Sequence, residues 1–156
     1  MISFTQENQR KFEHLLTRYP NKKAALLPTL WLVQDQYGFI SRDAMEYVAK
    51  ILDLAPAHVY SVVTFYTMYH QKPVGKHHIQ VCRTLSCALN GGEKILDHLK
   101  TKLKVKENEV TLDGKFSVCG VECLASCGTA PAVMINEKYY ENLSIEKVDQ
   151  LLNELK

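Results

Sequence analysis

The chain has 156 residues, of which 46% are apolar and 23% are charged. This length suffices for one hydrophobic core or two small ones, so neither metal nor disulfides are needed merely to fold it. The 19 basic and 17 acidic residues give a formal net charge of +2 and form no block of either sign, which argues against a surface built for nucleic acid or anionic membranes.

The first seven residues lack the basic start and apolar run of a secretory signal. No later run approaches the roughly 20 apolar residues of a membrane span, so we expect a cytoplasmic protein. In a reducing compartment five cysteines do not favour a disulfide framework, and an odd number cannot pair completely. Metal binding or thiol chemistry is the leading interpretation of them.

Apolar residues recur at helical spacing four times within the first seventy positions, which predicts four amphipathic helices. Gly38 is expected to end the second helix, Ser41 to cap the third, and Pro56 to lie in the first turn of the fourth. Pro28 falls inside the second periodic stretch, so the start of that helix stays open. The periodic residues are Phe12, Leu15, Leu16 and Tyr19; Leu26, Leu27, Leu30 and Trp31; Ala44, Tyr47, Val48, Ile51 and Leu52; and Val59, Val62, Val63 and Tyr66.

The segment 71–76 mixes Pro, Gly and polar residues and is the best candidate for a linker. Beyond it the order of predicted elements changes to strand, helix, strand, followed by a strand hairpin and a last helix. This order predicts a mixed sheet flanked by helices, with its first two strands parallel. The predicted elements are a strand over 78–82, a helix over 89–103, strands over 115–123, 132–135 and 139–140, and a helix opened by Ser144.

Two cysteine pairs follow the first two of these strands: Cys82 with Cys87, and Cys123 with Cys127. Neighbouring parallel strands would bring both loops to the same edge of the sheet, where the four thiolates can converge. In a 2Fe-2S cluster each tetrahedral iron takes two bridging sulfides and two protein thiolates. We therefore predict that Cys82 and Cys87 hold one iron, and that Cys123 and Cys127 hold the other.

A cluster with four thiolate ligands carries a charge of about −2 when oxidised and about −3 when reduced, so it requires hydrogen-bond donors. Small residues in the two loops allow backbone N–H groups to approach the sulfurs, and Arg83 is a candidate for a compensating charge. The small residues are Thr84, Ser86, Ala88, Gly128 and Thr129.

Zinc binding and plain buried thiols both stay open as alternatives on cysteine spacing alone. Structural zinc uses four cysteines at such separations, and unliganded cysteines commonly pack in protein cores. A Rieske centre is disfavoured because no histidine lies one or two residues after any of the four cysteines. Cys119 has no partner at motif spacing and is expected to be a structural thiol that shares a strand face with Val121 and Cys123.

The motifs resemble a known family. The similar parts of this chain are the Cys82 and Cys87 pair, the sequence 122–131 (ECLASCGTAP) and the upstream segments 27–38 and 59–69. The resemblance is to the peripheral 2Fe-2S subunit of respiratory complex I, the E subunit of NADH-quinone oxidoreductase. The fold of that family is a thioredoxin-like 2Fe-2S ferredoxin. The family commonly has glycine where this chain has Ala125, a departure that leaves ligation undisturbed if φ there is negative. In thioredoxin-like folds a cis proline precedes the third strand, which suggests a cis peptide at Ala130-Pro131.

The resemblance implies an electron-transfer subunit with no complete active site of its own. Its 2Fe-2S cluster, on Cys82, Cys87, Cys123 and Cys127, would accept one electron from FMN, with FMN and NADH bound by a partner subunit. Relatives also occur in soluble NAD-linked hydrogenases and formate dehydrogenases, which sequence does not separate from complex I. The chain would lie in the cytoplasm, or on the cytoplasmic side of the inner membrane through its partners, and a homodimer is possible when it is isolated.

We therefore expect an α+β protein. Residues 1–72 form an N-terminal four-helix domain that docks, and residues 73–156 form a thioredoxin-like mixed-sheet domain that carries the cluster. The rival from another class is a zinc-stabilised interaction or DNA-binding module, which is weakened by the lack of a basic face on the helices. Thiol-disulfide exchange is also disfavoured, because it usually relies on C-x-x-C spacing.

Overall fold

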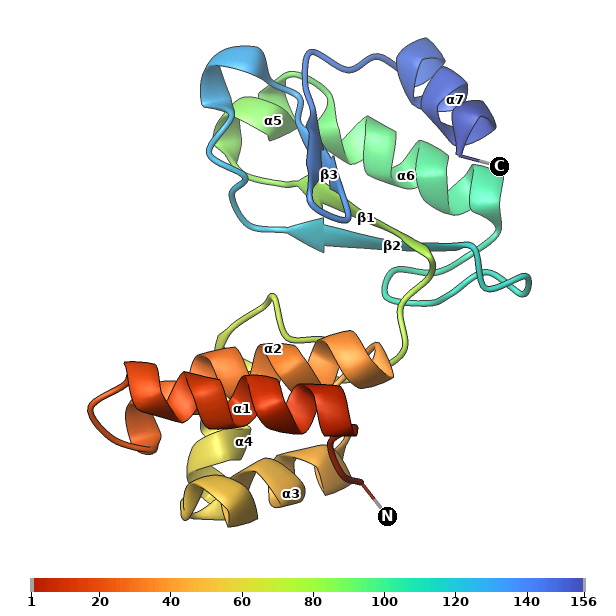
Figure 1. The fold of residues 1–156 in the computed structure, drawn as a ribbon. Coiled ribbons are helices and arrows are strands. Elements are labelled where there is room, and N and C mark those ends of the chain that lie inside the picture. The colour runs from red at the N-terminus through yellow and green to blue at the C-terminus, as the bar shows by residue number, and fades with distance from the viewer. Residues whose placement is uncertain (1, 156) are drawn as a thin grey trace. The chain divides into compact units, whose positions relative to one another are not determined.

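The computed structural model describes residues 2–155. The chain divides into two compact units, Met1–Pro73 and Val74–Lys156 (Figure 1). The fold is mixed, with helices throughout and a four-stranded sheet in the second unit. Within the described residues, no helix combines the length and apolarity needed to cross a lipid bilayer.

The first unit is helical, as predicted. Its elements are α1 (Gln6–Arg18), the 3-10 helix η1 (Lys23–Ala25), α2 (Leu26–Tyr37), α3 (Arg42–Leu52) and α4 (Pro56–Phe65). Helix α2 ends at Gly38, whose φ of 78° is left-handed, and Ser41 caps α3 by accepting a hydrogen bond from the Ala44 N–H over 3.2 Å. Pro28 falls in the first turn of α2, where its missing N–H costs no helical hydrogen bond, and this resolves the open boundary.

Apolar stripes of these helices form the core of the first unit. A polar residue of α2, Gln34, also contacts the segment that follows α4. Its side-chain amide donates to the Met68 carbonyl over 3.0 Å and accepts from the His70 N–H over 2.7 Å. The amide therefore ties the segment after α4 to α2. The largest fully buried side chains of the first unit are Leu26, Leu30, Val33, Ile40, Val48, Leu52, Val59 and Val63.

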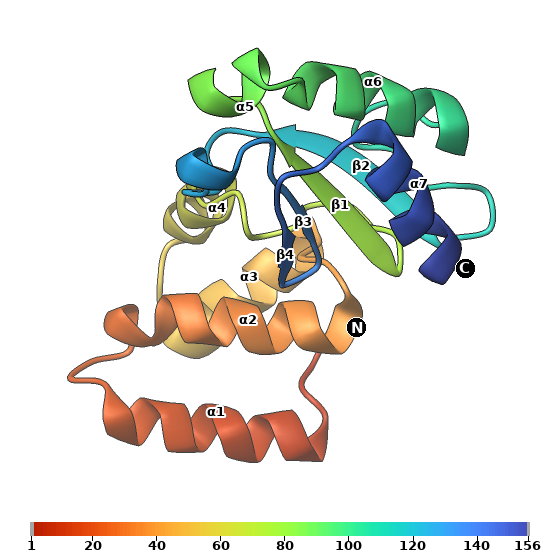
Figure 2. The ribbon, with the colours of Figure 1, turned by 90° about the horizontal axis from the view of Figure 1, so that it is seen from above.

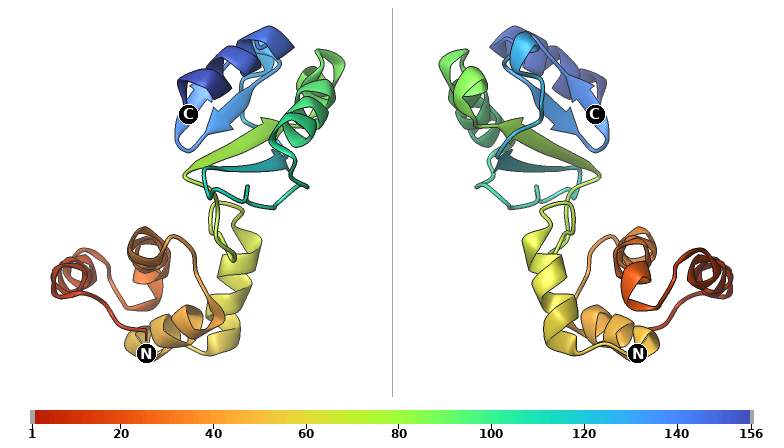
Figure 3. Two further views of the ribbon diagram at one scale, coloured as in Figure 1. Left: turned by 90° about the vertical axis from the view of Figure 1, so that its right-hand side faces the viewer. Right: turned by 90° about the vertical axis from the view of Figure 1, so that its left-hand side faces the viewer.

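The second unit consists of β1 (His77–Cys82), α5 (Leu85–Leu89), α6 (Gly92–Leu103), β2 (Phe116–Val121), the 3-10 helix η2 (Cys127–Thr129), β3 (Val133–Ile135), β4 (Lys138–Tyr140) and α7 (Ile145–Glu154). The strand order in the sheet is β2-β1-β3-β4. As predicted, β1 and β2 are parallel and β3 with β4 forms an antiparallel hairpin. Helices α6 and α7 lie on the same face of the sheet (Figures 2 and 3).

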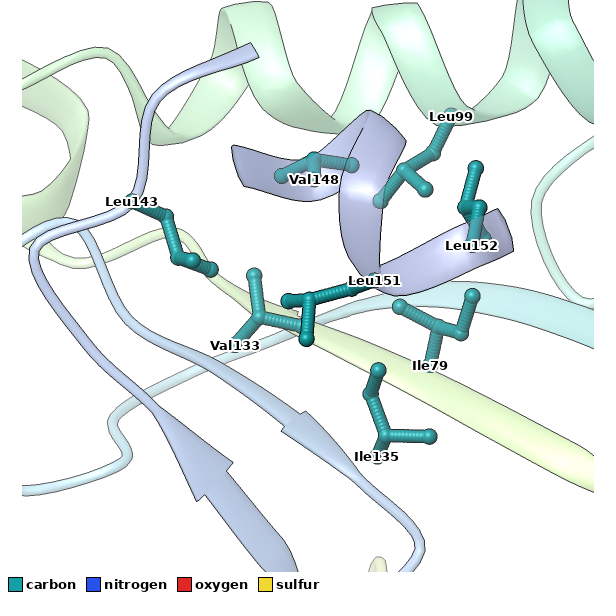
Figure 4. Close-up of a pocket in the computed structure, with 8 residues that line it drawn as sticks. All are labelled: Ile79, Leu99, Val133, Ile135, Leu143, Val148, Leu151 and Leu152. Carbon is teal, nitrogen blue, oxygen red and sulfur yellow. The ribbon is translucent and has the colours of Figure 1, made fainter. Parts of the chain in front are cut away.

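The core of the second unit lies between this sheet face and helices α6 and α7. Ile79, Val133 and Ile135 point from the strands towards Leu99 of α6 and residues of α7 (Figure 4). Between them is a cavity of only about 10 Å³, lined entirely by apolar side chains. A space of this size and polarity belongs to core packing and is not suited to a substrate.

The outer edge of β2 is covered by the loop that follows α6. Asn108 donates its N–H to the Val118 carbonyl over 2.8 Å, and Thr111 donates to the Phe116 carbonyl over 2.8 Å. The Glu107 carboxylate accepts the Gly120 N–H over 2.9 Å. Main-chain groups of this edge strand are therefore paired within the chain.

Candidate metal centre

The two cysteine loops leave the sheet side by side. Strands β1 and β2 are neighbours, and Cys82 at the end of β1 is in register with Val121 at the end of β2. Cys123 follows two residues later. The predicted meeting of both loops at one sheet edge is confirmed by this register.

Cys82 is buried, and its sulfur makes polar contacts with both loops. Its sulfur is 3.2 Å from the Thr84 hydroxyl oxygen, and as a thiol it donates to the Glu122 carbonyl over 3.2 Å. Burial opposes ionisation, but hydrogen bonds from the Thr84 hydroxyl and from the backbone N–H groups of Leu124 and Thr84 outweigh it and lower the pKa of Cys82. These donors favour the thiolate, the form that binds metal.

Cys87 lies on α5 and is also buried, with its sulfur in contact with that of Cys82. Burial raises the pKa of Cys87, the nearby sulfurs of Cys82 and Cys127 add to the rise, and a backbone hydrogen bond from Ala132 opposes it. Thiols release their protons when they bind metal. Of these two neighbouring thiols, Cys82 ionises more readily than Cys87, which suits such a site.

Helix α6 packs tightly behind this first pair. A Cβ atom on Gly92 would lie 2.8 Å from the Cys82 carbonyl oxygen and 2.9 Å from the Cys87 carbonyl oxygen. Only glycine permits this approach, because the neighbouring atoms belong to the backbone. The start of α6 thus fixes the main chain of the segment that carries both cysteines.

Cys123 and Cys127 are exposed. The backbone N–H of Ala125 donates to the Cys123 sulfur over 3.3 Å. Ala125 has a φ of 58°, in the left-handed region, so the condition under which alanine would leave the loop undisturbed, a negative φ, is not met. The loop conformation is one that favours glycine, and alanine adopts it with strain.

The four thiols come in two pairs, as the two irons of a 2Fe-2S cluster require. Structural zinc needs four ligands around one point, whereas each iron of a 2Fe-2S cluster takes two protein ligands. Two thiols in contact at Cys82 and Cys87, with an exposed pair on the neighbouring loop, meet that requirement. Ligation by the four residues stays a prediction.

The charge of Arg83, a candidate for compensating the cluster, is paired with two carboxylates. Its guanidinium pairs with Glu93 over 3.2 Å and with Glu107 over 3.1 Å. Its side chain also fills the space beside Gly120, where a Cβ atom would lie 2.2 Å from the arginine Cδ. Arg83 therefore links the end of β1 to α6 and to the loop that covers β2.

Cys119 is buried on β2 beside two further polar side chains. The Nε2 atom of His78 is 3.5 Å from the Cys119 sulfur, and its Nδ1 atom is 2.8 Å from the Ser117 hydroxyl oxygen, which accepts the Gly75 N–H over 2.9 Å. Burial, helped by the charge of Glu107, raises the pKa of Cys119 to about 11. The cysteine is thus a protonated, buried thiol at neutral pH. His78 is buried too.

The second loop ends at a cis peptide between Ala130 and Pro131, as predicted. One polar contact of this loop was missed from sequence. Glu141, just after β4, accepts hydrogen bonds from the hydroxyl groups of Ser126 and Thr129, which lie on either side of Cys127. The only sequence signal for it was a pair of hydroxyl residues around a cysteine.

The chain matches the model of one protein family over residues 12–156, described as thioredoxin-like [2Fe-2S] ferredoxin. The chain belongs to this family, and the cofactor of the family is a 2Fe-2S cluster. Among curated proteins, the E subunit of NADH-quinone oxidoreductase from Rickettsia bellii is 45% identical over 99% of this chain and 95% of that protein. The E 2 subunit of NADH-quinone oxidoreductase from Rhizobium meliloti is 38% identical over 92% of this chain and 86% of its own length.

A solved structure shows the same fold. An NAD⁺-reducing [NiFe]-hydrogenase in the air-oxidised state superposes with a TM-score of 0.72 over 83% of this chain at 20% identity. The match spans only 22% of that hydrogenase chain. The likeness therefore concerns architecture.

Proposed function

We propose that this chain is the electron-transfer subunit of an NADH:quinone oxidoreductase and carries one 2Fe-2S cluster on Cys82, Cys87, Cys123 and Cys127. The register of Cys82 with Val121 carries the proposal, because it starts both cysteine loops at one edge of the sheet. Relatives that are 38–45% identical over nearly all of their length are named as E subunits of NADH-quinone oxidoreductase. The hydrogenase alternative rests on 20% identity and is not favoured.

The residues around the cysteines prepare them for a cluster. Bound there, the cluster accepts and returns one electron. The Thr84 hydroxyl and the N–H groups of Thr84 and Leu124 stabilise negative charge on the Cys82 sulfur, and the N–H groups of Ala132 and Ala125 do so for Cys87 and Cys123. Binding requires the Cys82 thiol to lose the proton that it donates to the Glu122 carbonyl.

The electron donor is FMN on a flavin- and NADH-binding partner subunit. Two exposed leucines support docking beside the cysteines: Leu85 and Leu89, which flank the buried Cys87 on α5, are 75% and 78% exposed. The helical domain over 1–72 provides a second docking surface, where Phe65 is 77% exposed. Exposed apolar side chains of this size mark interaction surfaces. The chain sits on the cytoplasmic side of the inner membrane through these partners and can form a homodimer when isolated.

The test is purification without oxygen, followed by iron and acid-labile sulfide analysis and a visible spectrum. We expect about two irons and two sulfides per chain and absorption bands that bleach with dithionite. NADH alone should leave the bands unchanged, and NADH with the flavoprotein partner should bleach them. A colourless protein with neither iron nor sulfide, or with stoichiometric zinc, would overturn the proposal.

A further inference from the structure

The loop that carries Cys123 and Cys127 is not held by burial of those two side chains. Both are exposed, whereas Cys82 and Cys87 on the other loop are buried. A Cβ atom added at Gly128, next to Cys127, would meet nothing within 4 Å. Leu124 anchors the start of this loop by burial, and polar contacts hold the turn around Cys127.

The carboxylate of Glu141 supplies such contacts. Its Oε1 atom accepts the Ser126 hydroxyl over 2.6 Å and the Thr129 hydroxyl over 2.7 Å. One donor precedes Cys127 by one residue and the other follows it by two, so a single oxygen closes the turn η2 from both ends. The Thr129 hydroxyl has the Ser126 carbonyl, 3.3 Å away, as a weaker second acceptor.

The main chain reinforces this attachment. Asn142 donates its N–H to the Thr129 carbonyl over 2.7 Å, and Leu143 donates to the Pro131 carbonyl over 3.3 Å. Asn142 has a φ of 48°, which turns the chain just after Glu141. The segment 141–143 and the cysteine loop are thus joined by side-chain and main-chain hydrogen bonds.

We propose that Glu141 is a positioning residue for the second cysteine loop, and that its fixed negative charge beside Cys127 lowers the reduction potential of the cluster. This inference rests on the proposed function. Hydrogen bonds to a carboxylate are roughly twice as strong as those between neutral groups, so the contact restricts the turn before metal arrives. A permanent anion near a cluster that passes from about −2 to about −3 opposes the incoming electron.

Glu141 is ionised at neutral pH, and hydrogen bonds from Ser126 and then from Thr129 lower the pKa of its carboxyl below the ordinary value. It is also exposed, and isolated surface contacts add little to global stability. Its effect should therefore be local to the turn, and the experiment must separate local order, charge and folding.

Three variants of the full chain make this separation. Glu141→Gln keeps a side-chain oxygen that can accept both hydroxyls but removes the charge, and Glu141→Ala removes both. Glu137→Gln is the matched control, since Glu137 is an exposed carboxylate on the same hairpin, in the turn between β3 and β4. The readouts are amide hydrogen exchange of residues 126–129 in the metal-free protein, the rate of iron release to a chelator, and the potential from a dye-mediated redox titration.

We expect Glu141→Ala to speed iron release and amide exchange in the turn by roughly tenfold, the factor for losing one hydrogen-bond anchor, with the unfolding midpoint unchanged. Glu141→Gln should keep both rates near wild type and raise the reduction potential. Glu137→Gln should change the rates little and the potential less than Glu141→Gln.

Unchanged exchange and release in Glu141→Ala would overturn the anchoring role, and an unchanged potential in Glu141→Gln would overturn the charge effect. Wild-type protein without a cluster would instead refute the proposed function, while the exchange measurement would still decide the anchoring role.

Discussion

The backbone N–H of Ala125 reaches the Cys123 sulfur over 3.3 Å because Ala125 adopts a left-handed conformation with a φ of 58°. In this conformation the Cβ atom of an L-residue crowds its own carbonyl, at a cost of roughly 1–2 kcal/mol. Glycine has no such cost. The sulfur contact is thus made at the expense of local backbone strain.

Replacing Ala125 by Gly should therefore stabilise the protein. We expect the free energy of unfolding of the metal-free chain to rise by about 1 kcal/mol, somewhat less than the strain because glycine also loses more chain entropy on folding. Urea denaturation followed by circular dichroism measures this change. The matched control is Ala88→Gly on the exposed side of α5, which should lower stability by about 0.5–1 kcal/mol. Equal losses in both variants would contradict the strain argument.

The ligand assignment separates Cys123 from Cys119. Cys123→Ser should abolish the cluster, because serine replaces a thiolate on one iron. Cys119→Ser should keep iron and acid-labile sulfide at wild-type levels, since the Cys119 thiol is buried beside His78 and protonated. Anaerobic metal and sulfide analysis decides between them. Loss of the cluster in Cys119→Ser with retention in Cys123→Ser would invert the assignment.

Two glycines near the cysteines should differ in how well they tolerate replacement by alanine. Gly92→Ala would drive a Cβ atom into the Cys82 and Cys87 carbonyls, and we expect a loss of about 2 kcal/mol in stability and a lower cluster content. Gly128→Ala, although adjacent to Cys127, meets open space and should stay within about 0.5 kcal/mol of wild type. Thermal denaturation and iron content of both variants test this, and a tolerant Gly92→Ala would show that α6 is free to shift.

Alkaline pH should reveal the buried thiol of Cys119. Its pKa rises from an ordinary value of 9.0 to about 11 on folding, so the folded state favours the protonated form. The corresponding stability is fully present below pH 9 and is lost as pH rises towards 11, by about 3 kcal/mol in total.

The comparison is urea denaturation of metal-free wild type and Cys119→Ala, with reductant, between about pH 8 and pH 11. The remaining groups titrate alike in both proteins, so the difference between the two curves isolates Cys119. We expect wild type to lose more stability across this window than the variant does. Parallel curves would mean that the thiol ionises as readily when folded as when unfolded.

The spacing of apolar residues and the positions of Gly, Pro and capping residues predicted most of the fold. Helices with one apolar stripe and strands followed by cysteine pairs can both be recognised from short stretches of sequence. The four N-terminal helices, the parallel pair β1 and β2 and the hairpin β3 and β4 all follow from such patterns. Helix α5 was missed, since a five-residue helix between Cys82 and α6 is too short to show a period.

The details of the site depend on contacts between distant residues and were not predictable in the same way. Arg83 forms ion pairs with Glu93 and Glu107, which lie 10 and 24 positions away in the chain. The conformation of Ala125 runs against the preference of alanine, so local propensity points to the wrong region. The contact between Glu141 and Ser126 joins residues 15 positions apart and depends on the formation of the β3–β4 hairpin between them.

The covered edge of β2 has a consequence for self-association. An open strand edge offers a row of free N–H and C=O groups onto which another chain can add a strand. Here Glu107, Asn108 and Thr111 already occupy those groups at Gly120, Val118 and Phe116. Two copies of this chain should therefore not join into a continuous sheet through β2, and a dimer in solution must use another surface.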